Sequence, residues 1–296
     1  MKIKQILLAT FLVLISLFAA DKAQAQVSNS IDTNKVYVII KNDGSEFIGK
    51  IMSSDIYEVV LESQKLGAIA IPKHEIKIMK LLQNGDLDVA GSFIPNEPFA
   101  TRYFITTNGL PIAKGESYIT GNIFGPDFQY GLADNLGVGV ITSWIGSPII
   151  FTSKYSFEID KNVNGAVGLL IGTGGWGWAS SFGLAIPYGS ITLGDSKSNI
   201  TGSLGYGTIW GNDKYGGGRS IVSIAAMHKI SKGISLVFDS FILPPTSYQN
   251  NFALFIPGLR FQTSESSAFQ FGFAGASIGN YTGAIPFPYL QGFRKF

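Results

Sequence analysis

The sequence feature that most restricts the fold is the presence of two long stretches without a charged residue. Residues 162–194 hold none in 33 positions, and residues 266–293 hold none in 28. A membrane-spanning helix needs about 20 apolar residues, but the first stretch contains nine glycines and Pro187. Each internal glycine costs a helix about 1 kcal/mol relative to alanine. Apolar residues recur here at every second position, so the pattern predicts strands.

The clearest strand covers residues 149–159, with the sequence IIFTSKYSFEI. Phe151 and Phe157 fall on an apolar face, and Lys154 and Glu158 fall on a polar one. One apolar and one polar face over eleven residues is typical of a transmembrane barrel strand, with lipid outside and the lumen inside. A soluble sandwich also alternates. In a sandwich, however, small inward residues such as Gly272 would leave cavities, at about 24 cal/mol per Å3.

Short polar turns alternate along the chain with longer connections that are rich in glycine, proline and aromatic residues. This pattern predicts an all-β fold with about twelve antiparallel strands closed into a barrel, with both ends on one side of the membrane. Ten or fourteen strands are the alternatives, because the sixth run is long and contains Pro187. The expected strands cover residues 116–124, 128–133, 136–143, 149–159, 163–172, 178–193, 199–210, 220–230, 234–243, 251–262, 267–277 and 285–296.

Charge is distributed unevenly and divides the chain. Residues 26–97 carry 17 charges in 72 positions, an ordinary soluble composition, whereas residues 98–296 carry 21 in 199 together with 31 of the 36 glycines. We therefore expect a small β domain over residues 26–82, a linker over 83–98 and the barrel over 99–296. The boundary is a stretch rich in turn-forming residues.

Residues 1–25 have the layout of a secretory signal peptide. Lys2 and Lys4 precede an apolar run, and the small-residue site Ala23-Gln24-Ala25 follows it. The chain contains no cysteine, which excludes disulfides, a Cys-based zinc site and a lipidated cysteine. We expect the outer membrane as the location, with the N-terminal domain in the periplasm.

The first domain contains a glycine-spaced motif. Gly44 and Gly49 are followed by Ile51 and Asp55, and a run from Ala70 to Ile78 closes the segment. These residues resemble the first motif and the last two strands of the Sm/LSm-like small barrel, over about 45 residues. The asparagine and Arg-Gly that contact RNA in that family are absent here. The segment 26–97 carries 7 lysines and 10 acidic residues, a net charge of 7 − 10 = −3, which repels phosphate. The resemblance therefore implies a small periplasmic interaction module that binds no nucleic acid.

Two sets of residues in the barrel region are assigned to its surfaces. Charges within strands are expected to face the lumen, because a charge facing lipid costs roughly 2 to 4 kcal/mol for Arg or Lys near the midplane. Tryptophans at strand ends beside the longer loops are expected to form an aromatic girdle. The predicted lumen-facing residues are Lys154, Glu158, Asp239 and Arg260, and the predicted girdle is Trp144, Trp176, Trp178 and Trp210.

The last strand carries Phe287, Tyr289, Phe293 and Phe296. It resembles the C-terminal strand of Gram-negative outer-membrane barrel proteins, which implies outer-membrane lipids and the barrel-assembly machinery as partners. Residues 100–104 and 114–116 also resemble an uncharacterised group of such barrels with the same two-part layout, for which the resemblance implies no activity.

The sequence offers little catalytic chemistry. His74 and His228 are the only histidines. We expect no enzyme activity, catalytic residue, cofactor or metal ligand. The leading hypothesis is an outer-membrane barrel acting as a narrow channel or a structural membrane protein. The alternatives are a secreted or periplasmic β-rich binding protein and, less favoured, a lipid-modifying enzyme using His228 with Asp239, Ser240 or Ser223.

Overall fold

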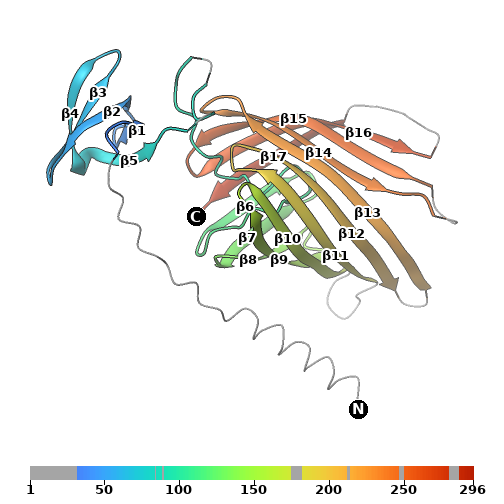
Figure 1. Cartoon of the computed structure of the whole chain (residues 1–296). Helices are drawn as coiled ribbons and strands as arrows, with labels where there is room; N and C mark the ends of the chain where they lie inside the picture. Colours follow the sequence, from blue (N-terminus) through green and yellow to red (C-terminus); the bar gives the residue numbers. More distant parts are fainter. Residues whose placement is uncertain are drawn as a thin grey trace. The chain divides into compact units, whose positions relative to one another are not determined.

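The computed structural model describes residues 32–83, 85–88, 90–174, 182–211, 214–246, 250–279 and 287–296, with the side chains of 214–217 excepted. The proposed signal peptide, Trp176 and Trp178 lie outside these ranges. The chain divides into two compact units, Met1–Leu82 and Gln83–Phe296 (Figure 1). No helix among the described residues has the length and hydropathy needed to cross a membrane.

The first unit is a five-stranded antiparallel sheet in the order β4-β3-β2-β1-β5. Its core contains Ile39, Ile51, Val59, Leu61 and Ile71. The sheet is not closed, so the small closed barrel expected here is not confirmed. The elements are β1 (Val36–Lys41), β2 (Glu46–Ser54), β3 (Glu58–Ser63), β4 (Gly67–Pro72), the 3-10 turn η1 (Lys73–Glu75) and β5 (Ile76–Leu81).

The two motif glycines of this unit have local structural roles. Gly44 has a φ of 85° in the turn between β1 and β2, a conformation that glycine adopts without steric cost. A Cβ at Gly49 would overlap the carbonyl oxygen of Glu62 on β3. The spacing therefore reflects a tight turn followed by a close approach of two strands.

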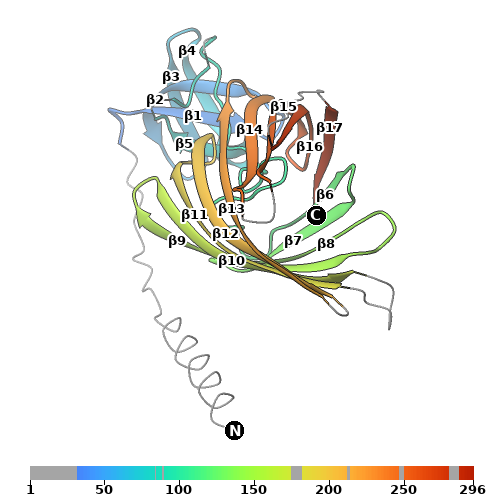
Figure 2. The ribbon, with the colours of Figure 1, turned by 90° about the vertical axis from the view of Figure 1, so that its right-hand side faces the viewer.

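The second unit contains a closed barrel of twelve antiparallel strands, which confirms the predicted fold class. Each strand pairs with its neighbour in sequence, and β17 pairs with β6 to close the ring (Figure 2). The strands are β6 (Ser117–Asn122), β7 (Pro126–Ala133), β8 (Leu136–Thr142), β9 (Ile149–Asp160), β10 (Val163–Gly174), β11 (Phe182–Gly194), β12 (Ser198–Gly211), β13 (Lys214–Lys229), β14 (Ile234–Leu243), β15 (Phe252–Ser264), β16 (Ser267–Ile278) and β17 (Phe287–Lys295).

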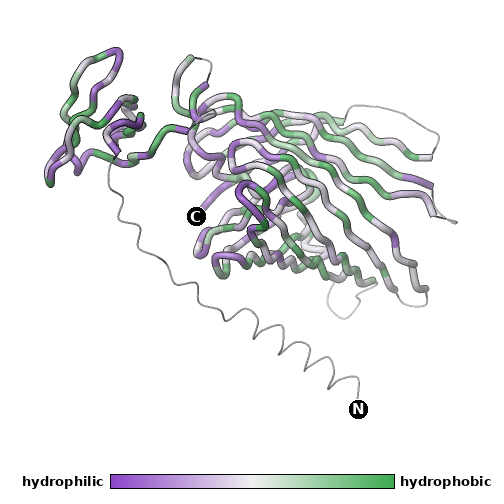
Figure 3. Tube along the Cα trace, in the orientation of Figure 1, coloured by the Kyte–Doolittle hydropathy of each residue, from purple (hydrophilic) through white to green (hydrophobic). Residues whose placement is uncertain are grey.

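The barrel wall exposes its apolar residues and buries its polar ones. On β16, Phe269 and Phe273 are 42% and 48% exposed, whereas Gln270 between them is fully buried. On β12, Ile200 is half exposed and Thr201 is buried. Figure 3 shows this alternation of hydrophobic and hydrophilic positions along the strands. A soluble protein has the opposite arrangement, and an apolar outer surface around a polar interior is typical of a barrel in a membrane.

Candidate functional site

The interior of the barrel is occupied by residues 97–112, which we call the inner segment. Phe99 and Tyr103 are fully buried, and Phe104 is 1% exposed. The segment folds back on itself, since the Tyr103 amide donates to the Thr106 carbonyl and Asn108 Nδ2 donates to the Ala100 carbonyl. It contacts ten of the twelve wall strands, which are β6, β7, β9, β11, β12, β13, β14, β15, β16 and β17. A segment bonded to strands on every side of a closed barrel lies in its lumen.

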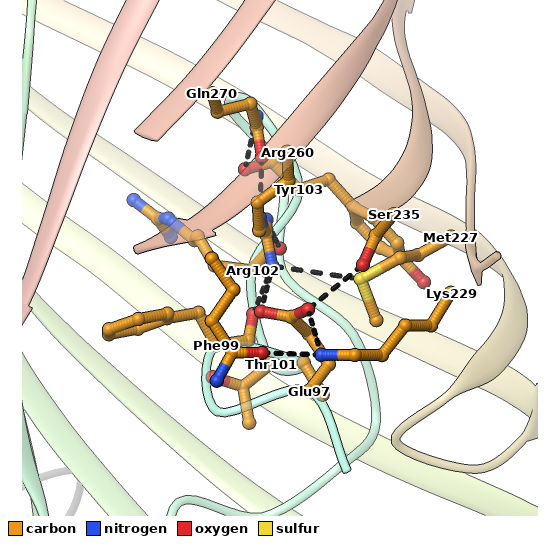
Figure 4. Close-up of polar contacts among 12 residues, drawn as sticks. Glu97, Phe99, Thr101, Arg102, Tyr103, Met227, Lys229, Ser235, Arg260 and Gln270 are labelled. Carbon is orange, nitrogen blue, oxygen red and sulfur yellow. Dashed lines mark hydrogen bonds and ion pairs between the residues drawn. The ribbon is translucent and has the colours of Figure 1, made fainter. Parts of the chain in front are cut away.

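Arg260 of β15 binds the backbone of the inner segment (Figure 4). Its Nη1 donates to the Phe99 carbonyl at 2.7 Å and its Nη2 to the Arg102 carbonyl at 2.6 Å. Its Nε donates to Gln270 on β16, and the guanidinium lies 4.6 Å from the centroid of the Phe293 ring. The planar guanidinium thus holds two carbonyls of the inner segment in fixed positions against the wall.

Glu97 at the start of the inner segment enters a buried charge cluster. Its Oε2 accepts from Lys229 Nζ at 3.1 Å and from Ser235 Oγ at 2.9 Å, and its Oε1 lies 3.6 Å from Arg260 Nη1. These three charged side chains are at most 1% exposed. Removing one partner from such a buried cluster leaves an uncompensated charge, which costs about 3 to 5 kcal/mol.

Asp239 of β14 binds the tip of the inner segment. Its carboxylate accepts from the Ile105 and Thr106 amides at 2.6 and 2.9 Å and from Thr106 Oγ1 at 2.7 Å. The residue is 1% exposed. Both backbone donors would otherwise be unpaired in the lumen, so this carboxylate stabilises the fold of the tip.

Lys154 of β9 binds the returning part of the inner segment. Its Nζ donates to Thr107 Oγ1, the Asn108 carbonyl and the Leu110 carbonyl at 3.2, 3.1 and 2.8 Å. All three ammonium protons therefore have neutral oxygen acceptors, and no carboxylate of the described residues forms an ion pair with this lysine.

Further contacts fix the inner segment laterally. Tyr103 Oη lies 2.5 Å from Asn199 Oδ1 and 2.7 Å from Thr201 Oγ1, both on β12. Arg102 forms an ion pair with the buried Asp127 of β7. A wall of polar residues pointing inward therefore provides the hydrogen-bonding partners that an irregular backbone needs inside a barrel.

Two inward-facing glycines make room for the ring of Phe104. A Cβ at Gly258 on β15 or at Gly272 on β16 would lie 2.6 Å from Phe104 Cζ. The ring also contacts Tyr289 edge to face, with centroids 5.5 Å apart. The space left by small residues in the wall is thus filled by an aromatic side chain of the inner segment.

The residues before the inner segment also pack within the second unit. Asp86 is buried and forms an ion pair with Lys197 of the turn between β11 and β12, and Lys197 Nζ lies 5.1 Å from the centroid of the Phe93 ring. Residues 83–98 were expected to be a linker and 99–296 the barrel. In the structure, residues 83–98 carry side chains buried within the second unit, among them Asp86, Phe93 and Glu97.

The residues predicted to face the lumen differ in their surroundings. Lys154, Asp239 and Arg260 are buried and bind the inner segment, whereas Glu158, near the turn end of β9, is exposed. Of the predicted girdle, Trp144 is 66% and Trp210 is 41% exposed. Trp144 Nε1 donates to the Asn122 carbonyl. Trp176 and Trp178 lie outside the described residues.

Sequence reasoning missed the inner segment, although it predicted that three of its wall partners, Lys154, Asp239 and Arg260, face the lumen. Glu97, Arg102 and Tyr103 lie before the first wall strand, where no alternating pattern identified them. Two features of the sequence could have indicated a buried segment here. The connection is long, since 34 residues separate Leu82 from Ser117. Its aromatic residues Phe99, Tyr103 and Phe104 are also unusual for a solvent-exposed connection.

The residues considered for hydrolysis are not arranged as a triad. His228 Nδ1 lies 3.1 Å from Ser198 Oγ at an exposed position, while the Asp239 carboxylate accepts hydrogen bonds from the inner segment. Ser240 Oγ instead bonds the Ile224 backbone across the seam between β13 and β14. Within the described ranges, no group of His, Asp and Glu side chains has the arrangement of a metal site.

Comparisons with known proteins found similarity in structure to two solved outer-membrane proteins, and no similarity in sequence to a known family. No family model matches the chain, and no curated protein matches it. The chain is similar to outer-membrane expressed OmpT of Vibrio cholerae, at 8% identity and a TM-score of 0.36, over 88% of this chain and 95% of that one. It is also similar to the loop L8 deletion mutant of OmpT, at 8% identity and a TM-score of 0.37, over 88% of this chain and 96% of the other. Values this low assign neither a family nor an activity to the chain.

Proposed function

We propose that this protein resides in the outer membrane as a β-barrel whose lumen is closed by its own inner segment. The apolar outer surface of the wall, with residues such as Leu204 and Phe151 64% and 59% exposed, supports placement in lipid. The layout of residues 1–25 supports export. The barrel would serve as a structural membrane protein or as a gated channel. A structural role requires no open path through the lumen, and a gated channel has none in its closed state.

The observation that carries the proposal is the set of buried charges that hold the inner segment. Arg260, Lys229, Asp239 and Lys154 come from four different strands, and each binds residues 97–112. A closed lumen conducts ions poorly, so a narrow channel would require the inner segment to move.

Single-channel recording of the refolded full-length protein in planar bilayers tests this proposal. We expect the wild type to be nearly silent. Asp239→Ala, which removes the acceptor for the Ile105 and Thr106 amides, should produce discrete openings. The control is Glu158→Gln, because Glu158 is exposed. Steady conductance of the wild type equal to that of Asp239→Ala would contradict a closed lumen.

A secreted or periplasmic binding protein is the alternative class. It predicts that the folded protein stays in solution without detergent after membranes are removed by ultracentrifugation. A membrane barrel should instead sediment with the membranes and run at a different apparent mass on a gel when it is not boiled. Recovery in the soluble fraction in the folded state would favour the alternative.

For the first unit we propose a small interaction module of the Sm-like type that faces the periplasm and binds a protein. The positive φ of Gly44, the close approach at Gly49 and the five-strand order β4-β3-β2-β1-β5 support this proposal. Ile56 and Tyr57 are 84% and 79% exposed at the turn between β2 and β3, and they provide an apolar contact for a protein partner. Cross-linking from a photoreactive residue at position 56 in cells, with position 65 as the control, tests this surface.

We also propose that β17 is the strand through which the barrel-assembly machinery recognises the chain. Phe287 and Phe296 are 54% and 76% exposed at the two ends of this strand. Phe296→Ser should lower the amount of folded barrel in the membrane without changing the stability of the protein that does fold.

A further inference from the structure

A cavity lies inside the barrel between the tip of the inner segment and the wall. Its volume is about 150 Å3, and an apolar cavity of about this size can hold a benzene ring. The described residues do not enclose it fully, so a small molecule can reach it. Most of its surface is apolar, with contributions from Ile112, Ile141, Leu170, Ile186, Ile221 and Phe241.

The charges around this cavity balance. Arg102 and Lys154 line it, and two buried carboxylates lie beside it. Asp127 forms an ion pair with Arg102, and Asp239 binds two amides of the tip of the inner segment, which also lines the cavity. Two positive and two negative side chains leave no net charge. An ion of either sign would lose its hydration here without gaining a counter-charge, so the cavity favours a neutral molecule.

Two serine hydroxyls lie side by side at the cavity. Ser203 on β12 and Ser223 on β13 are register partners, and both line the cavity. Opposite residues of neighbouring antiparallel strands have Cβ atoms about 4.5 to 5.5 Å apart, so one ligand oxygen can bond both hydroxyls. Ser223 is 4% exposed, and its Oγ has no hydrogen-bond partner among the described residues. A buried hydroxyl without a partner is unfavourable, so a ligand that bonds it is stabilised.

Other polar groups at the cavity already have partners within the protein. The Lys154 ammonium donates to three oxygens of the inner segment. Thr106 Oγ1 donates to Asp239, and Gln129 Nε2 donates to Asp127. At the serine pair, in contrast, the polar group of a ligand can bond Ser223 without displacing an existing hydrogen bond.

We propose that this cavity binds a neutral molecule of about six to eight heavy atoms that carries one hydroxyl on an apolar body, as a phenol does. The ligand hydroxyl donates to one serine and accepts from the other, because a hydroxyl can do both, and the body contacts Leu170, Ile186 and Phe241. A hydrocarbon of the same size would fill the space but leave Ser223 Oγ without a partner. This inference goes beyond the proposed function, since a closed membrane barrel does not require a ligand.

The test measures binding of 4-fluorophenol to the refolded full-length protein in zwitterionic micelles by 19F NMR, with empty micelles as the reference. We expect saturable binding that requires the protein. Relative to their uptake by empty micelles, fluorobenzene, which lacks the hydroxyl, should bind about fivefold more weakly, and 4-fluorobenzoate, which is charged, should show no saturable binding. Equal binding of the phenol and either analogue, or uptake by the micelles alone, would overturn the proposal.

Two serine variants test the hydrogen bond. Ser223→Ala should weaken the binding of 4-fluorophenol about fivefold and leave that of fluorobenzene unchanged, because only the phenol bonds the hydroxyl. Ser190→Ala is the matched control. Ser190 on β11 is the other register partner of Ser203, and its buried Oγ also lacks a partner among the described residues, but it does not line the cavity. Equal effects of the two variants would contradict the assigned role of Ser223.

A matched pair of tryptophan variants locates the site. Leu170→Trp fills the cavity and should abolish binding, whereas Leu169→Trp on the same strand, at a side chain 37% exposed on the outer face, should leave it unchanged. If Leu170→Trp does not refold, Ile186→Phe makes the same test. Equal binding by the filled and the outer-face variants would overturn the proposal. The heat-dependent gel shift of each variant reports the folded barrel separately, so loss of binding and loss of the fold are distinguished.

Discussion

Arg260 Nη1 donates to the carbonyl oxygen of Phe99 at 2.7 Å, and this bond joins the barrel wall to the segment inside it. The two residues are 161 positions apart in sequence, and both are fully buried. Because Arg260 also contacts Arg102, Gln270 and Glu97, a single side chain of β15 organises one side of the lumen.

Replacing Arg260 with methionine should loosen the inner segment. The change leaves two backbone carbonyls without their donor and removes one of the two cations that pair with Glu97, with an expected loss of about 3 to 5 kcal/mol in unfolding free energy. Trypsin should then cleave after Arg102, whose side chain is only 12% exposed in the intact barrel. The control is Arg294→Met on β17, where the side chain is exposed. Equal resistance of the two variants to cleavage at Arg102 would contradict the assigned role. In addition, the unfolding free energy lost by the double variant Glu97→Gln with Arg260→Met should be smaller than the sum of the losses of the two single variants.

Gly272→Ala should disturb the packing of Phe104. The added methyl would lie 2.6 Å from Phe104 Cζ and 2.8 Å from the Pro257 carbonyl oxygen, and overpacking of this kind costs about 1 to 3 kcal/mol. Gly275→Ala on the same strand meets no heavy atom within 4 Å and should be nearly neutral. Urea unfolding in lipid vesicles measures both. In a Phe104→Ala background, Gly272→Ala should lower the unfolding free energy by less than it does in the wild type, because the ring that clashes is gone. An equal loss in both backgrounds would mean that the clash is with the backbone alone.

A charge on the outer face of the wall tests the placement in lipid. Phe273→Arg introduces a guanidinium at a side chain that is 48% exposed, and the expected cost is about 2 to 4 kcal/mol if this position lies near the bilayer midplane. Leu66→Arg in the first unit, where the side chain is 66% exposed, should change stability by less than about 0.5 kcal/mol. The folding free energy of each variant is measured by folding into lipid vesicles from urea. If Phe273→Arg changes this free energy as little as Leu66→Arg does, the Phe273 side chain faces water.

Asp55 gives the first unit a dependence on pH. The Glu58 and Tyr57 amides donate to its carboxylate at 2.8 and 2.7 Å, and these bonds hold the pKa of Asp55 below its ordinary value of 3.8. Because the folded pKa is the lower one, the stabilisation is present above pH 3.8 and is lost as the pH falls through the folded pKa. Asp55→Asn should therefore speed amide exchange in β3 at pH 6, and this difference from the wild type should shrink below pH 3.8.

Hydrogen–deuterium exchange of peptides from β3 in the full-length chain, corrected for the intrinsic effect of pH, measures this dependence. Glu62→Gln, which changes an exposed carboxylate on the same strand, is the control and should not alter the profile. A constant difference between the wild type and Asp55→Asn across the pH range would show that the carboxylate charge is not responsible.

The wall of the barrel could be predicted from local patterns. Strand β14 has the same bounds as the predicted run 234–243, and β9, β10 and β16 differ from their predictions by two residues or fewer at each end. Period-two alternation and polar turns are properties of neighbouring residues, so they can be read without knowing what the strand contacts. The predicted run 178–193 agrees with β11 (Phe182–Gly194) to within one residue at its C-terminal end, and its first four residues lie outside the described ranges.

What the sequence by itself determined is the closed antiparallel wall, since an apolar outer face and a polar inner face impose a repeating pattern on every strand. Only the tertiary structure decided what fills that wall. The contacts of Glu97 with Lys229 and Arg260, and of Asp239 with Ile105, join residues more than 130 positions apart, and no local pattern encodes such pairings. The physical reason is that an irregular segment is specified by the partners its backbone and charges find in the lumen, and these partners become neighbours only when the barrel closes.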